Sequence, residues 1–202
     1  MISHEHKFIL ITPQKTGSTS LLKRLIKYCD IKRINKQGKE LFDIIDEFED
    51  LKGAPGLKKW GSKHIRIQQI KRGLDESNID INSYIKIGVV RNPFDRLVSF
   101  WSWKARGNRG ISLSKFSREM PPCFPFFTLD GRMGMDHIIR FENLQEDFND
   151  VCDKIGIPRE ELPHINKSKH KHYTEYYDEE TQQIVADKYK KDIEYFGYKF
   201  RE

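Results

Sequence analysis

Residues 7–25 of this 202-residue chain read KFILITPQKTGSTSLLKRL, and this stretch decides the fold. The apolar run of residues 7–12 is typical of a strand that is covered on both faces. Residues 17–28 are predicted to form a helix, because apolar side chains recur there at helical spacing. The turn between them, residues 13–20, holds one lysine, one glycine and four hydroxyl side chains. The sequence therefore predicts a strand, a tight turn and a helix that begins in the turn.

The turn at residues 13–20 has the composition of an anion-binding corner. The backbone N–H groups of residues 16–20 can point at one ligand. The start of a helix adds unpaired donors and a partial positive charge to them. We therefore expect a phosphate or sulfate group to bind here.

The turn differs from the G-x-x-x-x-G-K-[ST] loop that binds nucleoside triphosphates. Lys15 precedes Gly17 instead of following a glycine, and no leading glycine is present. An aspartate at the end of an apolar strand, which would hold magnesium, is also missing. We therefore expect cationic side chains and N–H groups, and no metal, to neutralise the ligand.

Strands and helices alternate along the rest of the chain. Further strands are predicted at residues 31–34, 84–90 and 137–141. Helices are predicted at residues 41–51, 66–74, 93–101, 142–155 and 178–194, a basic loop at residues 163–173, and a frayed N-terminus at residues 1–6. This alternation predicts an α/β fold, a three-layer P-loop-like domain with a mainly parallel central sheet flanked by helices. We expect residues 1–202 to form a single domain.

Composition narrows the class of protein further. The net charge of +6 favours an anionic ligand, or reflects a solvated basic surface. The cysteines, Cys29, Cys123 and Cys152, lie far apart and form no C-x-x-C pair, so neither zinc nor a disulfide framework is indicated. No signal peptide is visible, and no apolar run approaches the roughly 20 residues of a membrane span. These features predict a cytoplasmic protein without a membrane span.

A second candidate site follows the strand at residues 84–90. Arg91 stands at the carboxyl end of this strand, where the ligands of open α/β sheets gather. Asn92 and Pro93 suit the cap and the first turn of a helix, and Ser99 then lies about two turns along it. Arg91 and Ser99 could together clamp a second phosphate.

These motifs resemble those of sulfotransferases. Residues 13–20 resemble the 5′-phosphosulfate loop of that family, and RNPFDRLVSFW, residues 91–101, resembles its 3′-phosphate motif. Three later segments resemble the carbohydrate type, which includes the chondroitin and heparan-sulfate 2-O enzymes and small soluble bacterial relatives. These segments are RFENL (residues 140–144), LPHINKS (residues 162–168) and YKKDIEYFGY (residues 189–198).

The resemblance implies a donor, 3′-phosphoadenosine 5′-phosphosulfate (PAPS), and residues that bind it. Arg91 and Ser99 would hold the 3′-phosphate, and Lys15 would also stabilise the leaving phosphate. The 5′-phosphosulfate would be held by Lys15, Thr16, Gly17, Ser18, Thr19 and Ser20. By analogy with the late loop of relatives, the residues that close over the nucleotide would be Lys167, Ser168 and Lys169; a solvated basic loop is the alternative.

A general base must accept the proton of the acceptor hydroxyl, and histidine is the usual choice near neutral pH. His64 lies between the two donor motifs and resembles the histidine that follows the second strand in 2-O enzymes. A buried, hydrogen-bonded histidine is the alternative interpretation, and some relatives use a glutamate as the base. Other prominent residues are predicted to be structural: Asp95, Arg96, Phe100, Trp101, Trp103, Arg140 and Glu142.

The resemblance implies a PAPS-dependent sulfotransferase whose acceptor is a hydroxyl group, on a carbohydrate. We expect no nucleic-acid partner for such an enzyme. Two alternatives stay open. One is a metal-dependent small-molecule kinase, which the missing triphosphate loop disfavours. The other is a non-catalytic nucleotide- or RNA-binding protein on the same fold.

Overall fold

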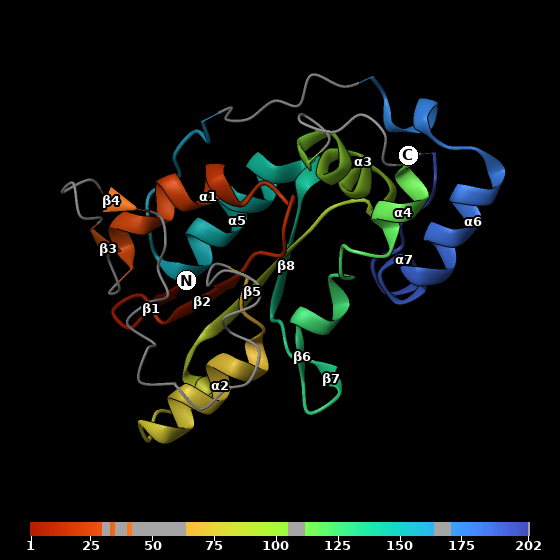
Figure 1. Cartoon of the computed structure of the whole chain (residues 1–202). Helices are drawn as coiled ribbons and strands as arrows, with labels where there is room; N and C mark the ends of the chain where they lie inside the picture. The colour runs from red at the N-terminus through yellow and green to blue at the C-terminus, as the bar shows by residue number, and fades with distance from the viewer. Residues whose placement is uncertain (30–32, 35–39, 42–63, 105–111, 164–170, 202) are drawn as a thin grey trace.

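A mainly parallel sheet of four strands lies at the centre of the fold (Figure 1). This computed structural model describes residues 1–29, 33–34, 40–41, 64–104, 112–163 and 171–201. In spatial order the strands are β1 (Ile2–Ser3), β2 (Phe8–Ile11), β5 (Ile85–Val90) and β8 (His137–Arg140). β2, β5 and β8 are parallel, and β1 pairs antiparallel with β2 at the edge. The predicted α/β fold with a mainly parallel sheet is confirmed.

The carboxyl ends of the three parallel strands meet at one edge of the sheet. Ile11 at the end of β2 pairs with Gly88, and Val90 at the end of β5 pairs with Arg140. The segments that leave these strands therefore lie close together, at the edge where α/β proteins bind ligands.

Helices cover both faces of the sheet. Figure 1 shows α1 (Ser18–Leu25) and α5 (Leu144–Ile155) on one side and α2 (Ile67–Glu76) on the other. Leu21 and Leu25 on α1 are completely buried, as their helical spacing predicts. All residues of β2 are apolar, because a strand covered on both faces has no solvated side.

A second group of helices extends the fold beyond the sheet. It consists of α3 (Pro93–Lys104), α4 (Leu113–Ser117), α6 (Glu179–Lys188) and α7 (Lys190–Phe196) (Figure 1). The first three of these helices enclose a hydrophobic cluster of their own, which includes Leu97, Val98, Phe116, Val185 and Tyr189. At the start of α3, Asn92 Oδ1 accepts a hydrogen bond of 3.0 Å from the N–H of Phe94, which confirms the predicted cap.

The predicted helix at residues 178–194 is wrong in one respect, because it is two helices that meet at Tyr189. This residue has φ −99° and ψ 18°, outside helical geometry. Its side chain is completely buried, and its hydroxyl donates a 2.8 Å hydrogen bond to the carbonyl of Met120. The break coincides with the packing of the Tyr189 side chain into the hydrophobic cluster of α3, α4 and α6. The helical periodicity of the sequence does not indicate this break.

The N-terminus is ordered, contrary to the predicted fraying of residues 1–6. Ile2 pairs with Ile9 in the sheet, and His4 Nδ1 lies 2.5 Å from the hydroxyl of Tyr84. β1 has only two residues, which is too short for an alternating pattern to show in the sequence, although its partner strand follows within a few residues.

Smaller elements complete the described part of the chain. β3 (Arg33–Ile34) pairs with β4 (Glu40–Leu41), and β6 (Thr128–Leu129) pairs with β7 (Arg132–Met133). Of the strand predicted at residues 31–34, the described residues Arg33 and Ile34 pair with β4 outside the central sheet. The helix predicted at residues 41–51 lies almost wholly outside the described residues. Short 3₁₀ turns lie at Ile26–Tyr28, Ile81–Ser83, Phe124–Phe126, Phe141–Asn143 and Tyr173–Tyr176. None of the helices formed by the described residues is long and apolar enough to span a membrane.

Candidate active site

The predicted anion corner follows the carboxyl end of β2. Thr16 is completely buried, and its Oγ1 donates a 2.8 Å hydrogen bond to the carbonyl of Pro13. Ser20 Oγ donates a bond of the same length to the carbonyl of Pro163. These two hydroxyls therefore brace the loop, whereas Ser18 and Thr19 remain partly exposed at the start of α1.

The backbone of this loop is strongly curved. Lys15 and Gly17 have φ values of 66° and 84°, in the left-handed region. A Cβ atom on Gly17 would lie 2.9 Å from Cδ2 of Phe141. Only glycine meets both conditions at low cost, whereas Lys15 adopts a conformation that is strained for a residue with a side chain.

The N–H groups of the loop form a set of donors suited to an anion. Among the described residues, no backbone carbonyl accepts a hydrogen bond from the N–H groups of residues 16–19. Gly17 is the N-cap of α1 and has no side chain with which to cap it. The partial positive charge at the start of α1 acts on the same space. These donors fit the phosphosulfate end of a nucleotide.

Arg91 lies where the sequence places it, directly after β5, but its guanidinium is already engaged. Its Nε and Nη2 lie 2.8 and 2.7 Å from Oδ2 of Asp95, and its Nη1 donates to the carbonyl of Lys15 at 3.2 Å. The ring of Phe141 lies 3.9 Å away, from centroid to guanidinium carbon. A 3′-phosphate would therefore share Arg91 with Asp95.

A cavity of about 630 Å³ opens beside Arg91. Its lining combines three cationic side chains with two carboxylates and two tyrosines; the residues are Arg91, Asn92, Asp95, Arg140, Glu142, Lys171, His172, Tyr173 and Tyr198. Ser99 is only 1% exposed and does not line this cavity. The predicted loop residues Lys167, Ser168 and Lys169 lie outside the described residues.

His64 lies next to the phosphate loop. Its Nδ1 lies 2.7 Å from the carbonyl oxygen of Thr12, the residue that links β2 to the loop. Because a carbonyl can only accept, Nδ1 must carry the proton of this hydrogen bond. In neutral His64 the proton-accepting nitrogen is then Nε2. A histidine oriented in this way can act as a general base.

Trp103 corrects the prediction that the aromatic residues of α3 lie in the core. Phe100 is buried and Trp101 half-buried, but Trp103 is 53% exposed. Its ring centroid lies 5.6 Å from Nζ of Lys15. The reason is its place in the last turn of α3, beyond the buried face of that helix. An exposed indole thus stands beside the lysine of the loop.

Glu142 and Arg140 are structural, as predicted. Glu142 accepts hydrogen bonds from the N–H of Asn92 at 2.6 Å and from the hydroxyl of Tyr198 at 3.1 Å. Burial raises the pKa of Tyr198, so this hydroxyl keeps its proton. Arg140 Nη2 donates to the carbonyl of Phe196 at 2.6 Å. These contacts fix the ends of β5 and β8 relative to each other.

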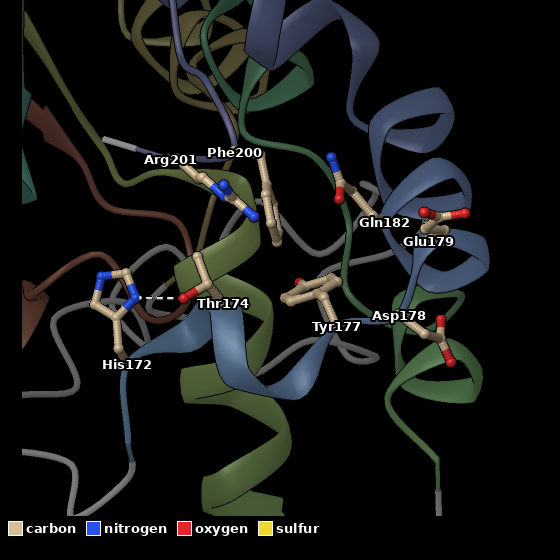
Figure 2. A pocket seen from close by; sticks show the side chains of 8 residues that line it. All are labelled: His172, Thr174, Tyr177, Asp178, Glu179, Gln182, Phe200 and Arg201. Carbon is tan, nitrogen blue, oxygen red and sulfur yellow. Dashed lines mark hydrogen bonds between the residues drawn. The ribbon is translucent and has the colours of Figure 1, made fainter.

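A second cavity, of about 660 Å³, lies on the C-terminal side of the fold (Figure 2). Figure 2 shows His172 and Thr174, joined by a 2.7 Å hydrogen bond, at one end and Tyr177 and Phe200 in the middle. None of the site residues predicted from the sequence lines this cavity. Within the described ranges, no group of three or more His, Cys, Asp and Glu side chains gathers to hold a metal ion.

Two comparisons with known proteins found matches. The model of the sulfotransferase family matches residues 1–120 and 112–199. Among solved structures, mouse sulfotransferase SULT7A1 complexed with PAP has a TM-score of 0.51 and 13% sequence identity. The match covers 96% of this chain and 86% of that chain, and at this identity it shows the fold alone. A search of curated proteins found no match.

Proposed function

Because the chain belongs to the sulfotransferase family, we propose that it transfers a sulfuryl group from PAPS to a hydroxyl group on a carbohydrate. The observation that carries the proposal is the position of His64. Its Nδ1 lies 2.7 Å from the carbonyl oxygen of Thr12, directly before the loop that contains Lys15. The mouse sulfotransferase of similar fold is complexed with PAP, which supports a nucleotide of the same kind here. Residues 1–202 then form one sulfotransferase domain.

Two anion sites hold the donor in this proposal. The N–H groups of Thr16, Gly17, Ser18 and Thr19 bind the 5′-phosphosulfate, whereas the N–H of Ser20 donates to the carbonyl of Gly17 at 3.1 Å. Ser18 and Thr19 can add their hydroxyls, whereas the hydroxyls of Thr16 and Ser20 are occupied. At the second site, Arg91 binds the 3′-phosphate. The predicted partner Ser99 is only 1% exposed and does not line the cavity beside Arg91, so it can contact the phosphate only if the surrounding side chains move. Lys167, Ser168 and Lys169 remain the residues proposed to cover the nucleotide.

The reaction is an in-line displacement at sulfur. The acceptor oxygen forms a bond to sulfur as the bond from sulfur to the bridging oxygen of the donor breaks. His64 Nε2 accepts the hydroxyl proton, and the Lys15 ammonium compensates the negative charge on the leaving phosphate. The products are a sulfate ester and 3′-phosphoadenosine 5′-phosphate (PAP).

The acceptor must approach the sulfuryl group from the side of His64 and Lys15, because reacting atoms have to come within about 3–3.5 Å. Trp103 stands beside Lys15 and offers an exposed flat apolar ring. Binding sites use such rings to orient ligands with apolar faces, and a sugar ring has a face of C–H groups. Trp103 therefore forms a wall of the acceptor site.

Trp103→Ala should raise KM for a carbohydrate acceptor by roughly tenfold, since a stacking tryptophan often contributes much of a binding energy. The Kd of PAP should not change, and Trp103→Phe should restore part of the acceptor affinity. Tyr195→Ala is the matched control, because Tyr195 is 54% exposed but lies on α7. An acceptor KM that is the same in Trp103→Ala and Tyr195→Ala would contradict this role.

The proposed function is tested with sulfur-labelled PAPS, a mixture of glycans and calorimetry with PAP. We expect label in the glycans, and PAP binding that Arg91→Ala weakens. Absence of PAP binding in the micromolar range, with Lys15→Ala and Arg91→Ala both behaving like wild type, would contradict the proposal. Magnesium-dependent ATP binding would support the kinase alternative, and RNA binding with steep salt dependence would support the RNA-binding alternative.

A further inference from the structure

We propose that Arg96 is a positioning residue that orients the phosphate loop for the donor, an inference that rests on the proposed sulfuryl transfer. Arg96 lies on α3 and is completely buried. Its Nε donates a 2.7 Å hydrogen bond to the carbonyl of Gln14, inside the loop. Its Nη1 donates a 3.0 Å bond to the carbonyl of Pro121. One side chain thus joins the loop to the segment that follows α4.

A hydrogen bond that holds a carbonyl also fixes the direction of the N–H in the same peptide group. In a trans peptide the carbonyl and the N–H of the next residue point in opposite directions. With the Gln14 carbonyl held by Arg96, the N–H of Lys15 points away from α3. With the Lys15 carbonyl held by Arg91 at 3.2 Å, the N–H of Thr16 points away from Arg91, which lies just before α3. Successive N–H groups that face one side form a concave anion site.

Lys15, between the two peptide groups whose carbonyls are held, has a left-handed conformation with φ 66°. Such a conformation is strained unless surrounding contacts maintain it. If Arg96 released the carbonyl of Gln14, that peptide could rotate and present its oxygen to the phosphosulfate. An oxygen dipole facing an anion would then oppose donor binding. Arg96 prevents this rotation without touching the ligand.

The buried environment of Arg96 argues against a purely packing role. Burying a guanidinium is costly, and among the described residues its Nη2 has no hydrogen-bond partner. Burial raises the pKa of the Cys123 thiol to about 12, so this neighbour stays neutral. Asp192, 2% exposed, is a buried carboxyl group that interacts electrostatically with both Arg96 and Cys123. An apolar side chain would fill the space without this cost, but only arginine reaches both carbonyls.

The test compares two ligands, PAP and adenosine 3′-monophosphate, which lacks the 5′-phosphate. The Kd of adenosine 3′-monophosphate divided by the Kd of PAP measures how strongly the loop binds the 5′-phosphate. Arg96→Lys keeps the charge but cannot hold both carbonyls, so we expect it to lower this ratio about tenfold. Tyr189→Phe is the matched control. It removes a buried hydrogen bond to the carbonyl of Met120, the residue before Pro121, to whose carbonyl Arg96 donates. This variant should lower Tm without changing the ratio of Kd values.

An equal loss of affinity for both ligands in Arg96→Lys would mean a merely structural role and overturn the proposal. A second measurement needs no variant. In amide NMR spectra of the wild type, PAP should shift the N–H protons of Lys15 and Thr16 downfield, and adenosine 3′-monophosphate should not. PAP binding without these shifts would also overturn the proposal. If the wild type does not bind PAP at all, the proposed function itself fails, and this inference fails with it.

Discussion

Lys15→Asn should lower kcat for sulfuryl transfer by about 100-fold or more, because the charge on the leaving phosphate loses its compensating ammonium. Asparagine is the informative replacement. Lys15 has φ 66°, and asparagine is among the residues that best tolerate the left-handed region. The backbone of the loop should therefore keep its shape, and the loss should appear in kcat at saturating PAPS and acceptor.

The control for this experiment is Lys23→Asn, which removes an exposed lysine from α1, the helix that follows the loop. It changes the net charge equally and should leave kcat unaltered. Lys15→Arg keeps a positive charge and should retain part of the activity. If Lys15→Asn and Lys23→Asn have similar kcat values while both bind PAP, Lys15 does not stabilise the leaving group.

The fold and the placement of the loop could be predicted because they depend on local patterns. The apolar runs at β2 and β5 indicate strands that are covered on both faces. Because these strands are parallel, they bring the loop and Arg91 to the same edge of the sheet. The lysine, glycine and hydroxyl content of the turn is the sequence signal on which the proposed anion site rests. Each of these signals lies within a few consecutive residues and therefore does not depend on contacts between distant segments.

Other features depend on contacts between distant segments, and the sequence did not reveal them. Arg96 was predicted to stabilise the helix and sheet, but it donates to the carbonyl of Gln14, 82 positions away. Trp103 was predicted to be buried because aromatic residues usually are, and its exposure depends on where α3 ends. Phe141 contacts both Gly17 and Arg91, and only the parallel pairing of β8 with β5 brings it there. The pairing of β6 with β7, by contrast, has a local signal in Asp130-Gly131, which is typical of a tight hairpin turn.

Phe141 contacts residues of both proposed anion sites. Its ring packs against Gly17 in the phosphate loop and lies 3.9 Å from the guanidinium carbon of Arg91. Arg91 in turn donates to the carbonyl of Lys15. The loop and the proposed 3′-phosphate residue are therefore linked through shared contacts.

His64→Asn should lower kcat by about 10²–10⁴-fold, the usual contribution of a general base, without weakening PAP binding. The asparagine amide can still donate to the carbonyl of Thr12 in place of Nδ1, whereas nothing replaces Nε2. The dependence of kcat on pH provides the decisive measurement. In the wild type, kcat should fall as the pH is lowered, because a protonated His64 cannot accept the acceptor proton. In His64→Asn this acidic limb should disappear.

His6→Asn is the control for this variant. His6 precedes β2, at the end of the strand opposite the loop, so its replacement should leave both kcat and the acidic limb unchanged. His64→Gln tests the same assignment from the other side, because its amide lies nearer the position of Nε2 but cannot accept a proton at neutral pH. It should be as inactive as His64→Asn. An acidic limb that persists in both His64 variants would assign the base to another group, and His64 would then have only its structural bond to Thr12.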